Sequence, residues 1–274
     1  MALPVSNLRT IITDGTNEAA VSSHNALLTN NFMLAVAMGL IPGMSHINKF
    51  GRNAAATSGD DVWDGGGVYA FFPATAQTVQ AVSTSTDDDA GGIGALTMQV
   101  YGLDDNFDEQ NEEVILDGTN PVVLDNTYRR LFRAVIKTAG TAETNVGNIS
   151  VGVAAGAVGV YIGAGNGQTL QCIYTIPNGK SGYFVKGYVG LVDDDKNGET
   201  AQFQWQARPN NGTTGAWAVQ GEMGLNNIGS SWWQYEYGIQ AGPLPEKTDL
   251  RIRVITATAT LGTVGGFDLL LVDD

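Results

Sequence analysis

The sequence predicts an all-β protein that consists of two antiparallel β-sandwiches, of the immunoglobulin-like or jelly-roll-like kind, preceded by a helix and an extended arm. Apolar residues alternate with polar ones along many short segments, which is typical of half-buried strands. The 36 glycines are dispersed among Thr, Asn and Asp residues instead of recurring at every third position, which favours frequent turns. With 274 residues, 43% of them hydrophobic, the chain is long enough to bury two cores.

The N-terminal segment, residues 1–54, differs in pattern from the rest. Apolar residues recur at spacings near three and four between residues 25 and 40, which predicts a helix, and Pro42 and Gly43 end it. Residues 43–53 have neither the helical nor the strand period and are predicted to form an extended arm. An arm with so little apolar surface cannot form its own core, so we expect it to lie on another domain or another subunit.

Residues 55–155 are predicted to form the first sandwich, with about seven strands. The alternation is clearest at Leu96, Met98 and Val100, and turn-forming residues lie before it at 87–92 and after it at 104–108 and 117–121. Residues 151–162 are rich in Gly, Ala and Val, and either a buried strand pair or a crossover between domains fits them.

Residues 160–274 are predicted to form the second sandwich, whose strands are longer and which ends in a strand near the last residue. Asn197-Gly198 lies between two predicted strands and indicates a hairpin with a type I′ turn. Cys172 alternates with Leu170, Tyr174 and Ile176, so we expect it to be a small buried hydrophobe instead of a reactive thiol.

The charge balance bears on the partners. The formal net charge is -14, and no Lys or Arg lies between Arg52 and Arg129, an interval that holds half of the carboxylates. Such a surface repels phosphate backbones and anionic lipids, so neither nucleic acid nor a membrane is expected as a partner. The first ten residues lack the pattern of a secretory signal, and the apolar run 32–41 is too short to span a bilayer, which predicts folding in a cytosol.

Catalytic, cofactor and metal sites are not expected. The two histidines, His24 and His46, both precede the predicted sandwiches, which argues against a His-based triad. Oxygen-bearing side chains occupy every second position from Asp104 to Glu112, but the glycine and the final acid of a calcium loop are missing, and a solvated hairpin explains the pattern better. The same holds for the acidic positions between residues 193 and 199.

Trp232 and Trp233 are adjacent on a predicted strand and must point to opposite faces. One of the two rings therefore cannot belong to the same core layer. A subunit interface that buries the second ring is favoured, since such interfaces are enriched in Trp, and a sugar-stacking platform is the alternative.

The chain resembles a widespread family of virion structural proteins of tailed bacteriophages, common in marine and freshwater phages. The resemblance covers nearly the whole chain and is carried by residues 43–53, 61–67, 102–104, 106–107, 165–170, 245–250 and 266–273. It implies a structural role in the virion and supplies no catalytic residues.

The resemblance and the composition together lead to one functional expectation. The protein is expected to be a capsid decoration or cement protein in the virion, assembled in the bacterial cytoplasm as a homo-oligomer, with a trimer expected, and partnered by the major capsid protein. The expected subunit or capsid contacts are His46, Lys49, Phe50, Arg52, Trp232 and Trp233. Lys49 and Arg52 are candidates to pair with an acidic capsid surface. A neck, tail or fibre component is the first alternative, and a carbohydrate-binding module for host attachment is the second.

Overall fold

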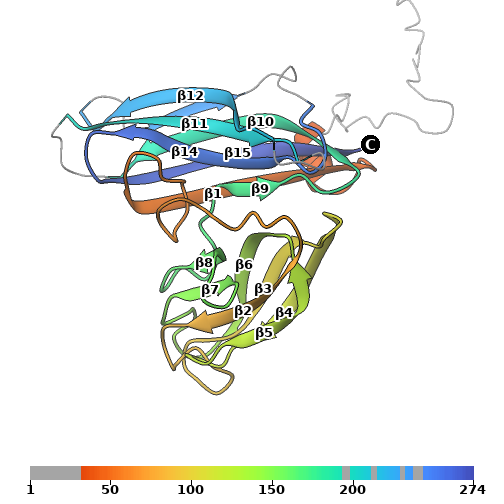
Figure 1. Cartoon of the computed structure of the whole chain (residues 1–274), viewed down its shortest axis with the longest axis vertical. Coiled ribbons are helices and arrows are strands. Elements are labelled where there is room, and N and C mark those ends of the chain that lie inside the picture. Colours follow the sequence, from red (N-terminus) through yellow and green to blue (C-terminus); the bar gives the residue numbers. More distant parts are fainter. Residues whose placement is uncertain (1–31, 193–197, 211–214, 229–231, 237–242) are drawn as a thin grey trace, which may run out of the picture. The chain divides into compact units, whose positions relative to one another are not determined.

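The computed structural model of the protein describes residues 32–192, 198–210, 215–228, 232–236 and 243–274 (Figure 1). The chain divides into two compact units, residues 1–42 and residues 43–274. In the first unit, the described residues contain one short helix, α1 (Phe32–Ala37). The part of the predicted helix between residues 25 and 31 lies outside the described residues. All named strands belong to the second unit, and they pair antiparallel, which confirms the all-β prediction.

The first sandwich consists of two sheets with the strand orders β5-β2-β7-β8 and β4-β3-β6. Its strands are β2 (Gln77–Ser83), β3 (Ala95–Leu103), β4 (Glu109–Ile115), β5 (Val122–Tyr128), β6 (Arg130–Ala139), β7 (Ile149–Gly152) and β8 (Val158–Ile162). Met98 and Val100 are buried between the sheets, as their alternation predicted. Strands β7 and β8 pair with each other, so residues 151–162 form the strand pair and not a crossover.

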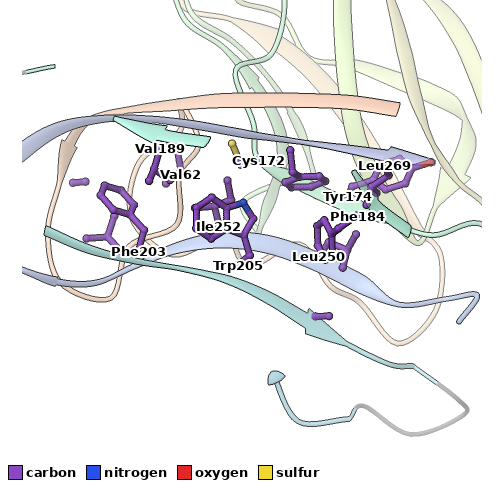
Figure 2. Packing of buried hydrophobic residues seen from close by; sticks show 14 of the residues in the cluster. Val62, Cys172, Tyr174, Phe184, Val189, Phe203, Trp205, Leu250, Ile252 and Leu269 are labelled. Carbon is purple, nitrogen blue, oxygen red and sulfur yellow. The ribbon is translucent and has the colours of Figure 1, made fainter. Parts of the chain in front are cut away.

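The second sandwich consists of sheets with the orders β1-β15-β10-β13 and β12-β11-β14-β9. Its strands are β1 (Met44–Ala56), β9 (Ile173–Thr175), β10 (Lys180–Leu191), β11 (Thr200–Arg208), β12 (Ala218–Asn226), β13 (Trp232–Glu236), β14 (Asp249–Ala257) and β15 (Leu261–Asp273). Figure 2 shows its core, in which Trp205, Phe203, Leu250 and Ile252 pack against residues of the facing sheet. Cys172 lies in this core, fully buried, as expected.

The prediction of an extended arm at residues 43–53 is wrong. Residues 44–53 belong to β1, which pairs with β15 from Met44 to Ala56 (Figure 1). The apolar period is missing because the inward positions are Lys49, Gly51 and Asn53. A Cβ atom at Gly51 would lie 2.6 Å from the carbonyl oxygen of Val62 and 2.7 Å from the amide nitrogen of Cys172, so only glycine fits there. The first sandwich is therefore inserted in the chain between β1 and β9 of the second.

The hairpin predicted at Asn197-Gly198 is also wrong. Residue 197 lies outside the described residues, but the strands on either side belong to different sheets: β10 pairs with β13 and β15, whereas β11 pairs with β12 and β14. Gly198 does have a positive φ of 81°, as a turn glycine often has. The Asn-Gly pair therefore lies in the connection between strands of the two sheets and not in a hairpin.

The two sandwiches share the segment that leads into β9. Residues 171–177 are buried without a break, because successive side chains point into different cores. Cys172, Tyr174 and Ile176 pack in the second core, while Ile173 packs in the first. This arrangement ties both cores to the same stretch of backbone.

Candidate functional site

Three of the expected contact residues, His46, Lys49 and Phe50, line one cleft of about 640 Å³. This cleft, called the β1 cleft below, lies where β1 of the second sandwich faces the β4-β3-β6 sheet of the first. Its lining residues are His46, Ile47, Asn48, Lys49, Phe50, Tyr101, Glu109, Gln110, Asn111, Phe132, Arg133, Gln168, Thr169 and Tyr174. The sequence identified the β1 residues but gave no sign that strands β4 and β6 complete the cleft.

Lys49 is buried, so an acidic surface that stays outside the cleft does not reach it, and only a group that enters the cleft can pair with it. Its Nζ atom donates a hydrogen bond to the main-chain carbonyl of Phe132 and lies 5.9 Å from the centre of the Phe132 ring. Burial lowers the pKa of Lys49 to about 7, against an opposing effect of Cys172 and with a smaller lowering from Arg133. The amine is half-neutral near pH 7 because its charge is poorly solvated.

The other expected contacts on β1 are more accessible. Arg52 is exposed, and its expected contact with a partner stays a prediction. The Nε2 atom of His46 lies 3.8 Å from Oδ2 of Asp268 on β15, and both side chains are partly exposed. His24 lies outside the described residues.

The two adjacent tryptophans point to opposite faces of β13, as predicted. Trp233 packs against the second core, with its ring centre 5.8 Å from that of Trp205. Trp232 is 57% exposed. Because β13 is an edge strand of its sheet, Trp232 is placed where another surface can reach it.

A buried ion network joins the two sandwiches and was not among the features predicted from the sequence. Asp249 on β14 is fully buried and accepts hydrogen bonds from Arg130 of the first sandwich (2.7 and 3.1 Å), from Arg208 (2.6 Å) and from the hydroxyl of Thr175 (2.7 Å). Burial alone would raise the pKa of Asp249, but the charge of Arg130 and the hydrogen bonds from both guanidinium groups outweigh it and lower the pKa. Asp249 is thus a carboxylate held in its charged form by partners from both sandwiches.

Aromatic rings alternate with the guanidinium groups of this network. The centre of the Phe72 ring lies 5.3 Å from the Cζ atom of Arg130 and 4.6 Å from that of Arg208. The centre of the Trp217 ring lies 4.5 Å from the Cζ atom of Arg208 and 3.9 Å from that of Arg251. Cation–π contacts of this kind stabilise desolvated guanidinium groups. The interface therefore consists of charge pairs enclosed by rings, and its polar groups serve the packing of one sandwich on the other.

A second buried acid, Asp61, lies beside the same strand. Its Oδ1 atom is 3.5 Å from Arg251 and 4.0 Å from Arg253, and its Oδ2 atom accepts a hydrogen bond from the amide of Tyr69 (2.9 Å). Burial raises the pKa of Asp61 to about 6 against the opposing charge of Arg251. The charged face of β14, with Asp249, Arg251 and Arg253 at every second position, was the sequence signal that could have indicated a buried charged layer.

The acidic turn at residues 104–108 joins β3 to β4 as a hairpin, as expected. The carboxylate of Asp104 accepts hydrogen bonds from the amides of Asn106 (2.7 Å) and Asp108 (2.9 Å), so it stabilises the turn. Within the ranges that the structure describes, no group of three or more His, Cys, Asp or Glu side chains is placed to hold a metal ion. No helix in the described part of the chain has the length and apolar character needed to cross a membrane.

The state of Lys49 leads to a pH prediction. An unfolded Lys has a pKa of about 10.4, so between pH 7 and about 10 the unfolded chain binds the proton that folded Lys49 has released, and stability rises with pH. Below pH 7 Lys49 is protonated in both the folded and the unfolded protein, so its contribution to the pH dependence of stability vanishes. Replacement by methionine (Lys49→Met) should remove a slope of up to about 1.4 kcal/mol per pH unit. Urea unfolding at pH 7, 8 and 9 measures this.

The matched control for this prediction is Lys137→Met, which alters a half-exposed lysine on β6 paired with Glu113. Its stability should run parallel to that of the unmodified protein over the same pH range. Parallel curves for Lys49→Met as well would contradict the assignment of a lowered pKa to Lys49.

Comparison with known proteins gives no family. No family model matches the chain, and no curated protein matches it. Among solved structures, the infectious bursal disease virus Gt strain aligns with 89% of this chain and 86% of that chain at 11% identity, with a TM-score of 0.13. T=1 particles derived from infectious bursal virus align with 88% and 83% at 11% identity, with a TM-score of 0.12. Likenesses this weak carry no argument about fold or function.

Proposed function

We propose that this protein is a non-enzymatic structural component of a tailed-phage virion, which decorates the capsid as a homo-oligomer, with a trimer expected, and binds the major capsid protein. The observation that carries the proposal is the exposed apolar surface of the N-terminal unit. Phe32, Leu34, Met38 and Leu40 are between 50% and 61% exposed, in and just after α1. Apolar residues gathered in this way mark a contact with another protein.

The organisation of residues 43–274 supports the proposal. The two sandwiches share a buried ion network and a common backbone segment, and such contacts favour a structural role. The buried acids and arginines of the interface are occupied with one another, which favours a structural role for them over a catalytic one. The net charge of -14 favours a protein partner over nucleic acid.

A variant with serine at the four exposed apolar positions (Phe32→Ser, Leu34→Ser, Met38→Ser, Leu40→Ser) tests this proposal. Its affinity for virions stripped of the protein should fall at least tenfold in co-sedimentation, because burial of even one such side chain contributes about 1.5–3 kcal/mol and 1.4 kcal/mol is a factor of ten.

The matched control replaces two equally exposed apolar residues of the first sandwich, Ile115→Ser and Val123→Ser. This variant should bind as the unmodified protein does. If the four-serine variant still binds with full affinity, the N-terminal unit is not the capsid contact.

A further inference from the structure

The β1 cleft exposes the edge of a strand and not one of its faces. Successive side chains of a strand point to opposite sides, yet all five residues from His46 to Phe50 line the cleft. The inner edge of β1 is paired with β15 over this stretch. On the outer edge, one backbone hydrogen bond is found among the described residues, from the amide of Gln171 to the carbonyl of Phe50 (2.8 Å).

Main-chain groups along the cleft are therefore available to a further strand. In an antiparallel strand the N–H and C=O groups of one residue point to the same side, and this side recurs at every second residue. Because the carbonyl of Phe50 points outward, the main-chain groups of Asn48 and His46 point outward as well. Within the described part of the chain, no backbone partner meets them.

The cleft also holds polar side chains that lack a full set of partners. The Tyr174 hydroxyl is buried and has no hydrogen-bond partner among the described residues. The Tyr174 ring packs edge-on against Phe132, with ring centres 5.1 Å apart, and Phe132 supplies the carbonyl that accepts from Lys49. A buried hydroxyl without an acceptor destabilises the structure, and an acceptor on a ligand would remove this penalty.

The charge of the cleft differs from that of the whole protein. Its titratable lining includes His46, Lys49 and Arg133 against one acid, Glu109, in a chain with twice as many acidic as basic residues. A carboxylate that enters the cleft meets donors and positive charge. It would also favour the charged form of Lys49, whose charge is poorly compensated by the residues around it.

We propose that the β1 cleft binds an extended peptide segment of a partner protein, which adds as a strand to the outer edge of β1 and places an acidic side chain against Lys49 and the Tyr174 hydroxyl. Main-chain hydrogen bonds give affinity in strand addition, and side-chain pockets give specificity. The open edge, from His46 to Phe50, matches a segment of about five residues. This inference concerns the cleft alone and holds whichever protein supplies the segment.

The test uses two heptapeptide libraries, acetylated and amidated at their ends, with Glu or Gln fixed at the centre and the other six positions randomised. Immobilised full-length protein should retain the Glu library at least tenfold better than the Gln library. Lys49→Met should reduce this preference to below about twofold, while Lys137→Met, which alters a half-exposed lysine on β6 of the first sandwich, should keep it. N-methylation of alternate backbone amides in the selected peptides should abolish binding.

Thermal unfolding confirms that each variant is folded, and Tyr174→Phe, which removes only the hydroxyl, replaces Lys49→Met if that variant fails to fold. Tyr174→Phe should weaken retention of the Glu library at least threefold. Equal retention of the two libraries by the unmodified protein, absence of retention, or a preference for Glu that survives the substitution in the cleft would each overturn the proposal.

Discussion

Replacement of Asp249 by alanine should lower the free energy of unfolding by about 3–5 kcal/mol, the usual cost of removing one partner from a buried ion network. Asp249 is fully buried between Arg130 of one sandwich and Arg208 of the other, and neither guanidinium has another carboxylate within ion-pair distance in the described part of the chain. The substitution would leave both charges buried without a counter-charge. Urea unfolding at pH 7 measures the loss.

Asp273→Ala is the matched control, because it removes an ion pair with Lys180 in which the Asp273 carboxylate is more than half exposed. Exposed pairs contribute little, so this variant should unfold close to the unmodified protein. Similar losses in the free energy of unfolding for the two variants would show that the buried ion network does not stabilise the interface between the sandwiches.

The second large effect is expected for Asp88→Ala, with a loss of about 3 kcal/mol or more. The Asp88 carboxylate is fully buried and accepts hydrogen bonds from the amides of Ala95, Val146 and Gly147, each at 2.8 Å, and from the hydroxyl of Ser83 at 2.6 Å. Alanine would leave the buried amides of Ala95 and Gly147, and the partly buried amide of Val146, without this acceptor. Thermal unfolding at constant pH measures the change.

Asp87→Ala provides the control in the same turn, since the Asp87 side chain is exposed. Its unfolding temperature should stay within about 2 °C of that of the unmodified protein, as surface substitutions usually do. An equal loss for both variants would indicate that the turn, and not the buried carboxylate, sets the stability of this region.

Much of the fold could be predicted from the sequence because strands and turns are determined by residues that are close together in the sequence. The alternation around Met98, the turn at residues 104–108 and the opposed rings of Trp232 and Trp233 depend only on neighbouring residues. The strand β1 could not be recognised in this way, because its inward positions carry Lys49, Gly51 and Asn53, which fit only against groups contributed by distant segments.

Contacts between segments that are far apart in the sequence could not be predicted from the pattern of neighbouring residues. Arg130 and Asp249 are 119 residues apart, so nothing in either neighbourhood indicates the other. For the same reason the sequence identified His46, Lys49 and Phe50 as contact residues but not the cleft that they line together with β4 and β6. The Asn197-Gly198 signal failed differently, since turn-forming residues can lie between strands of different sheets as well as between paired strands.

The most direct test of the proposed role is to locate and count the protein in purified virions, by gold-labelled antibody and by quantitative mass spectrometry against the major capsid protein. We expect label over the whole capsid shell and hundreds of copies per particle. Six or twelve copies at a single vertex would instead assign the protein to the neck or tail. Absence from purified particles would contradict a structural role in the virion altogether.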